Sequence, residues 1–197
     1  MKSIAFSLFA FSLFLFPSSG VFAKNLENIH VVWKPTTAVK PISKTMKFVE
    51  RVTVEEFADA RKNPELLGEY RKKDKPEVFR VTTKDNMGAF VTEGIRKSLE
   101  NAGFSTVKSG GEVMVSGEII KYFVSEANVY KGEIEIEVRI KDGQGESLWS
   151  GVIKGTQERW GVSYKAENYF EVLSDMIVNT VNNLTTDSGI QKAFIRK

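Results

Sequence analysis

The sequence contains no cysteine and only one histidine, His30, among its 197 residues. Without cysteine the chain has no disulfide, no cysteine-based zinc site and no thiol nucleophile. A Ser-His-Asp triad could use only this histidine, and no second imidazole exists to complete a usual zinc site. Gly110-Gly111 matches neither GxGxxG nor GxxxxGK[ST], so a phosphate-binding loop has no support. The sequence therefore predicts a protein that is not an enzyme, with no metal and no cofactor.

The charge of the chain is also nearly balanced. Lys and Arg number 28 against 25 Asp and Glu, which gives a formal net charge of +3. Proteins that bind nucleic acid usually show a strong basic excess or a basic stripe, and neither is present here. We therefore expect no nucleic-acid partner.

The first 23 residues have the pattern of a secretory signal peptide. Lys2 precedes an apolar run over residues 4–16, which is shorter than the roughly 20 residues that a membrane-spanning helix needs. The small residues near Ala23 predict cleavage after it and export to the periplasm. The mature chain then suits one domain. We divide it into an N-terminal arm or edge strand at 24–47 and a single α+β domain at 48–197.

Two segments show the apolar periodicity of amphipathic helices. In residues 85–104, apolar residues recur on one face at four-residue intervals, at Met87, Val91, Ile95 and Leu99. Asp85 is the expected N-cap and Gly103 the expected C-cap of this helix. Residues 167–184 predict a second amphipathic helix, because apolar residues recur there at three- and four-residue spacing.

Alternating apolar and polar residues predict the strands of a sheet. The segments with this pattern are 48–57, 113–124, 134–141 and 149–155. Asp142-Gly143 supplies a tight turn between the last two. The elements together predict an α+β fold, a mostly antiparallel β-meander sheet with two amphipathic helices packed on one face. Residues 58–84, which are polar and contain two prolines, predict a long loop that is either functional or mobile.

This predicted loop carries the candidate binding residues Asp59, Arg61, Tyr70 and Arg71. Two interpretations of Asp59 and Arg61 stay open. The pair braces the loop through a charge-assisted hydrogen bond, or it forms the rim of a partner site at a strand end. In the second case Arg61 or Arg71 reads a carboxylate or a phosphate of the partner.

Two charged runs are candidates for further sites. The run Arg71–Lys75 contains four basic residues and one acidic residue, which favours either a solvated loop or contact with an anionic surface such as lipid headgroups. A peripheral membrane association is therefore an open possibility. Glu133, Glu135 and Glu137 form an acidic row, but their alternation with isoleucines favours a solvated strand face over a calcium site or an acid–base pair.

Several short motifs in order resemble the YajG-like family of bacterial envelope lipoproteins, a largely uncharacterised group. They are V-x-V-x-x-F-x-D-x-R at 52–61, L-G-x-Y-R at 67–71, L-x-x-A-G-F at 99–104, V-x-G-x-I at 115–119, I-x-I-x-V at 134–138, and the tail from Asp187 to Ile195. The resemblance implies a non-enzymatic envelope protein of β-rich α+β fold. The family is anchored by lipid on an N-terminal cysteine, whereas residues 20–24 here contain none.

We therefore expect an exported, non-catalytic module that binds an envelope protein or another cell-envelope component. The alternatives from other classes are a small-molecule-binding domain or weak hydrolase, or an accessory subunit of an envelope transporter. The pocket of the small-molecule alternative is expected between sheet and loop, lined by Trp33, Tyr70, Tyr122 and Trp160.

Overall fold

The computed structural model describes residues 26–43, 47–73, 75–161 and 163–195. The predicted signal peptide and its cleavage site lie outside the described residues. The elements follow one another along the chain as β1 (Arg51–Val54), β2 (Ala58–Asp59), β3 (Leu66–Arg71), β4 (Val78–Thr82), α1 (Met87–Ala102), β5 (Ser105–Val107), β6 (Val113–Glu126), β7 (Val129–Asp142), β8 (Ser147–Trp160), α2 (Ala166–Thr186), α3 (Ser188–Gln191) and the 3₁₀ helix η1 (Lys192–Phe194).

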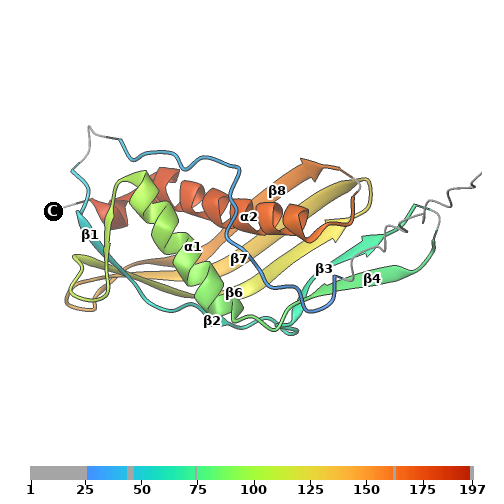
Figure 1. The fold of residues 1–197 in the computed structure, drawn as a ribbon. Coiled ribbons are helices and arrows are strands. Elements are labelled where there is room, and N and C mark those ends of the chain that lie inside the picture. Colours follow the sequence, from blue (N-terminus) through green and yellow to red (C-terminus); the bar gives the residue numbers. More distant parts are fainter. Residues whose placement is uncertain (1–25, 44–46, 74, 162, 196–197) are drawn as a thin grey trace, which may run out of the picture.

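The strands of the described chain form one eight-stranded sheet (Figure 1). β6, β7 and β8 are long and pair as an antiparallel meander, as the sequence predicts. On the other side of β6, however, β1, β2 and β3 all pair with it in parallel. β5 extends the sheet in parallel beyond β1, and β4 extends it antiparallel beyond β3. The α+β class is confirmed, but the sheet is mixed and not a simple antiparallel meander.

The inner face of the sheet is apolar because the alternation in the sequence continues over whole strands. On β7, the side chains of Ile134, Ile136, Val138 and Ile140 are at most 2% exposed. The residues between them face the other side and remain partly exposed. A strand with this pattern fixes its register, since a slip of one residue would expose its whole apolar set.

Helix α1 begins one residue later than the sequence suggests. Its N-cap is Asn86, whose side chain accepts a hydrogen bond from the Ala89 N–H, and not Asp85. Gly103 ends the helix in the left-handed conformation at φ 113°, as predicted. Asp85 does not cap the helix, because its carboxylate accepts a hydrogen bond from the Val31 N–H of the N-terminal arm.

Helix α2 lies beside α1 on the same face of the sheet (Figure 1). Two glycines allow α2 to approach strand β8 and helix α1 closely. A Cβ on Gly155 of β8 would lie 2.2 Å from the Met176 carbonyl oxygen, and one on Gly94 of α1 would lie 3.0 Å from Ile177. The prediction of two helices packed on one face is therefore confirmed.

The segment 58–84 is not the loop that the sequence analysis expects. It contains β2 and a β-hairpin formed by β3 and β4, so that prediction is wrong. Strand β3 is joined to the sheet by parallel pairing of Gly68 with Val124 of β6, a partner far away in the sequence. A Cβ on Gly68 would lie 2.2 Å from the Val124 carbonyl oxygen, so glycine is required for this approach.

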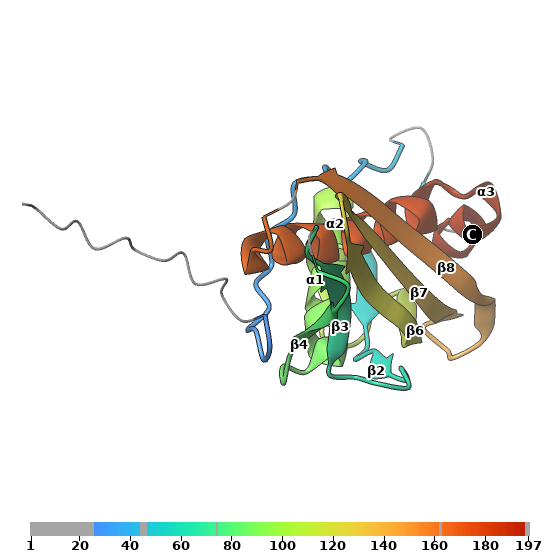
Figure 2. The same cartoon turned by 90° about the vertical axis from the view of Figure 1, so that its right-hand side faces the viewer.

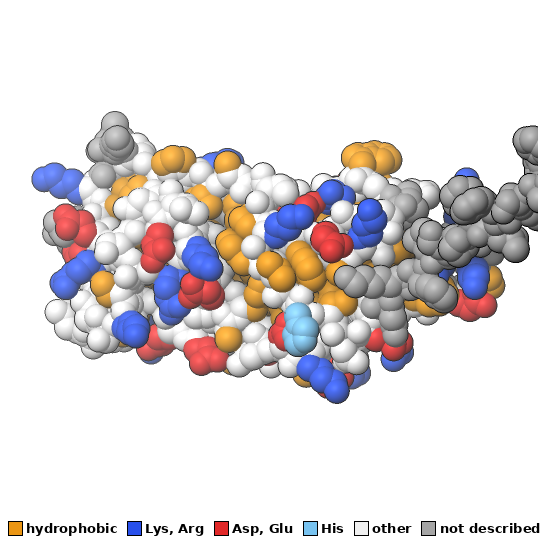
Figure 3. Space-filling model, in the orientation of Figure 1, with side chains coloured by type: hydrophobic (Ala, Val, Ile, Leu, Met, Phe, Trp, Pro, Cys, Tyr) orange, Lys and Arg blue, Asp and Glu red, His pale blue; other side chains and the backbone are white. Residues whose placement is uncertain are grey.

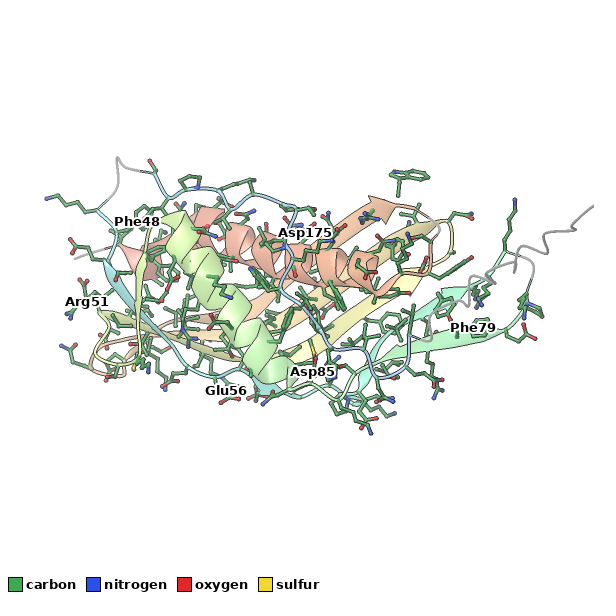
Figure 4. All side chains as sticks on the ribbon, viewed as in Figure 1. Phe48, Arg51, Glu56, Phe79, Asp85 and Asp175 are labelled. Carbon is green, nitrogen blue, oxygen red and sulfur yellow. The ribbon has the colours of Figure 1, made fainter. Side chains whose placement is uncertain are left out.

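The described part of the N-terminal arm, 26–43, contains no strand and runs across the two helices (Figure 1). Asp175 of α2, labelled in Figure 4, accepts hydrogen bonds from the N–H groups of Thr36 and Thr37 and from the Thr36 hydroxyl. Trp33 packs edge-on against Phe90 of α1. The arm thus covers the outer side of α2, which explains why polar residues of that helix are buried.

Candidate binding surface

The residues predicted to bind a partner lie at the two ends of the β3–β4 hairpin. We call Asp59 and Arg61 the hairpin root, and Arg71, Lys72, Lys73 and Lys75 the hairpin tip. In Figure 2 the end of the molecule with the hairpin and the β6–β7 turn faces the viewer. The root consists of the last residue of β2 and a residue shortly after it, and the tip consists of the last residue of β3 and the turn that leads to β4.

Arg61 of the root is buried, with its side chain only 5% exposed. Its Nε and Nη2 donate to the two carboxylate oxygens of Asp59 at 2.8 and 2.7 Å, a bidentate pair. The remaining donors bond three backbone carbonyl oxygens, those of Pro64, Leu66 and Tyr122. This is the charge-assisted brace that one of the two sequence interpretations describes.

The brace uses the whole hydrogen-bonding capacity of the guanidinium. An arginine has five N–H donors, and the five acceptors around Arg61 match that number. No donor remains for a carboxylate or phosphate of a partner. Because Tyr122 belongs to β6, Arg61 ties the start of the hairpin to the central strand of the sheet.

Tyr70 lies inside the hairpin end and is 5% exposed. Its ring stacks on Phe79 of β4 at 5.0 Å between centroids and contacts Tyr164 at 5.2 Å. Burial raises the pKa of the Tyr70 hydroxyl above its usual value. The Tyr164 hydroxyl donates to the Arg71 carbonyl oxygen, which joins the β8–α2 connection to the hairpin. Tyr70 therefore supports the hairpin from within.

A buried carboxylate, which the sequence analysis did not single out, fixes this connection. Glu126 at the end of β6 is 2% exposed and accepts hydrogen bonds from the Tyr169 hydroxyl and the Tyr164 N–H. Burial raises the pKa of Glu126, while hydrogen bonds from Tyr130 and Tyr169 oppose that shift. The only sequence signal was its place at the end of an alternating strand, where an apolar residue would be expected.

The tip is the exposed part of this end. Arg71, Lys73 and Lys75 are exposed, and the Lys72 ammonium lies 4.9 Å from the centre of the Phe79 ring. The tip lines a hollow of about 560 Å³ together with Ala127 and Asn128 of the β6–β7 turn. Of the four predicted binding residues, only Arg71 thus presents its side chain to solvent.

The acidic row on β7 is paired with basic side chains on the outer face of the sheet. Glu133 accepts from the Lys121 ammonium and Glu135 from the Lys154 ammonium. The hydrogen bond from Lys121 lowers the pKa of Glu133. Glu137 is paired with Arg139 at 3.0 Å. These contacts agree with the solvated strand face and not with a shared cation.

His30 is 91% exposed at its side chain, and its Nδ1 lies 3.0 Å from the Asp85 carboxylate. Figure 3 shows acidic and basic side chains interspersed on this face, with apolar side chains gathered around the arm. Within the described ranges, no group of three or more His, Cys, Asp or Glu residues is arranged to hold a metal ion. Among the same residues, no helix is long and apolar enough to cross a membrane.

The aromatic residues proposed to line a small-molecule pocket do not meet. Trp33 packs on α1, Tyr70 lies in the hairpin end, and Trp160 is 80% exposed. Tyr122 is buried beneath α2, and its hydroxyl donates to the Leu173 carbonyl oxygen at 2.8 Å. Three of the four residues therefore have packing roles, in separate places.

Comparisons with known proteins identify the fold and no family. No family model matches the sequence, and no curated protein matches it. Among solved structures, the DUF330 protein from Xanthomonas campestris is similar with a TM-score of 0.54 and 10% identity, over 77% of this chain and 90% of that one. This likeness shows a shared fold.

Two further solved structures are more distant. The PelC dodecamer from Paraburkholderia phytofirmans has a TM-score of 0.44 and 12% identity, over 81% of this chain and 96% of that one. The uncharacterised lipoprotein B from Nitrosomonas europaea has a TM-score of 0.41 and 10% identity, over 85% and 100%. The resemblance to the YajG-like family is not confirmed by these matches and stays a hypothesis.

Proposed function

We propose that this protein is an exported, non-catalytic module of the cell envelope, which contacts an envelope component through the tip of the β3–β4 hairpin. The observation that carries this proposal is the division of the hairpin into a buried root and an exposed basic tip. Asp59, Arg61 and Tyr70 hold the hairpin in place from inside. Arg71 and the neighbouring lysines of the tip are left to meet the partner.

Three features support this assignment. The leader sequence favours export, as the resemblance to envelope lipoproteins also does. Glu133 and Glu135, which are candidates for an acid–base pair, form ion pairs with lysines of the neighbouring strands. The tip, in contrast, is presented on strands that a bidentate buried arginine anchors to β6, so the contact surface is held on a rigid support.

In-cell crosslinking tests the proposal directly. A photoreactive amino acid in place of exposed Lys73 should yield crosslinked adducts with an envelope component in intact cells. The same amino acid in place of Lys108, which is exposed in the β5–β6 connection, is the matched control and should yield far fewer. Equal labelling from the two positions, or no adduct from Lys73, would contradict the proposal.

A further inference from the structure

One large aromatic side chain at the hairpin end is left in solvent. Trp160, the last residue of β8, is 80% exposed, while most other large apolar side chains of the described chain are buried or half-buried. Trp160 pairs across the sheet with Val129, the first residue of β7. Val129 directly follows Ala127 and Asn128, the turn residues that line the hollow together with the tip. Trp160 and the tip thus border the same turn.

The basic charge of this end belongs mainly to the tip. Lys131 and Arg159, which lie nearby on β7 and β8, are already paired with Glu158 and Glu171. The tip contributes four basic residues, and the acidic residues of the same turn in the sequence are Asp74 and Glu77. A cluster of this kind on a projecting turn attracts an anionic surface over a distance of about one Debye length.

The geometry points to an anionic phospholipid membrane as the surface that this end contacts. We infer that the tip lies on the lipid headgroups while the Trp160 ring enters the interfacial layer. This inference rests on the proposed function, in which the hairpin end is the contact surface. Tryptophan prefers the membrane interface because its ring is apolar and its N–H is polar. Basic residues on flexible stems suit a surface of many phosphates.

A protein partner fits these observations less well. Protein interfaces usually have a fully buried apolar core with aromatic anchors in well-packed pockets. Here the hollow is lined by Arg71 and three lysines together with Ala127 and Asn128, and the Trp160 side chain is exposed instead of filling a pocket. An acidic protein partner is therefore the competing outcome of the test.

Vesicle sedimentation with the purified protein tests the inference. The probes are vesicles of phosphatidylglycerol mixed with phosphatidylcholine, and vesicles of phosphatidylcholine alone. The variant R71S/K73S/K75S should bind the anionic vesicles roughly 100-fold more weakly, since each basic residue near the surface contributes a factor of about five. The matched control K108S/K141S/K192S makes the same charge change at the other end of the molecule and should bind as the unmodified protein does.

The tryptophan is tested by two substitutions with different expected results. Adding anionic vesicles should shift the fluorescence emission of the unmodified protein to shorter wavelength. W160F should lose this shift and keep most of the binding, because phenylalanine is still apolar. W160S should lose the shift and also bind more weakly, and this loss should persist at high salt, where the contribution of the tip is screened.

Several outcomes would overturn the membrane assignment. They are equal binding to both kinds of vesicle, equal weakening by the tip and control variants, and an emission shift that W160F retains. If the unmodified protein does not bind vesicles while the photoreactive residue in place of Lys73 still crosslinks to a protein in cells, the membrane inference fails and the proposed function stands. If neither vesicles nor any envelope component is bound from the tip, both fail.

Discussion

The root and the tip of the β3–β4 hairpin each contain an arginine, and the surroundings of the two arginines are opposite. Arg61 is buried and gives its five donors to five acceptors within the protein. Arg71 is exposed beside three lysines. A buried charge without partners is very costly, so Arg61 must be paired for the fold to be stable, whereas Arg71 is under no such constraint. Burial thus separates Arg61, which stabilises the hairpin, from Arg71, whose side chain faces solvent and is the one that we propose meets a partner.

The largest expected effect is at the root. Arg61→Ala removes the cation of a buried pair and leaves Asp59 and three backbone carbonyl groups without their donor. We expect a loss of about 3–5 kcal/mol in the free energy of unfolding, measured by urea denaturation. Arg61→Lys should recover only part of this loss, because an ammonium does not reproduce the bidentate geometry. A loss below 1 kcal/mol for Arg61→Ala would show that the root is not a brace.

The buried position of Arg61 determines which substitutions can test the hairpin as a contact surface. Replacing Arg61 and Arg71 together would confuse unfolding with loss of contact, since Arg61 is structural. Only substitutions at the tip separate the two effects. The sequence could not supply this distinction, because the carbonyl group of Tyr122 that helps to bury Arg61 belongs to a strand 61 residues away.

The same reason explains which elements could be predicted from the sequence. α1, α2 and the β6–β8 meander have long, regular apolar patterns, and each can be predicted from its own residues. β2 and β3 are short, and their parallel partner is β6, so their own residues carry little signal. The arm shows the same limit, since Thr36 is held by Asp175, 139 residues away. At the candidate site, the Asp59–Arg61 pair was predictable from its spacing, but its burial was not.

Two buried carboxylates next to the hairpin end should respond to pH with opposite signs. Burial raises the pKa of Glu126, so the native state loses stability as the pH rises from the ordinary carboxyl pKa through that raised pKa. The hydrogen bond from Lys34 lowers the pKa of Glu171, and burial opposes this shift in part. The charged form of Glu171 therefore stabilises the native state, and that contribution disappears as the pH falls through the lowered pKa.

Denaturation curves of Glu126→Gln and Glu171→Gln at several pH values would check this contrast. Relative to the unmodified protein, Glu126→Gln should become more stable as the pH rises through the raised pKa of Glu126. Glu171→Gln should be less stable at neutral pH and should approach the unmodified protein in acid. Curves that stay parallel to that of the unmodified protein would show that neither carboxylate has the surroundings described here.

A smaller effect is expected where the hairpin is joined to the β8–α2 connection. Tyr164→Phe keeps the ring that contacts Tyr70 and removes the hydroxyl that donates to the Arg71 carbonyl oxygen. We expect a loss of about 0.5–1 kcal/mol in stability, as for one exposed neutral hydrogen bond. Hydrogen exchange should become faster in β3 and β4 and remain unchanged in β7. Uniformly faster exchange would mean that the hydroxyl stabilises the whole domain.

The smallest effect on stability should come from the tip itself. In R71S/K73S/K75S all three side chains are exposed, and surface substitutions of this kind usually change the free energy of unfolding by less than about 0.5 kcal/mol each. The melting temperature should therefore stay close to that of the unmodified protein, in contrast to Arg61→Ala. If the tip variant were strongly destabilised, the basic residues would be part of the fold, and the difference between root and tip would disappear. A stable tip variant that has lost its contacts would instead place recognition at the tip, on strands that the root holds in position.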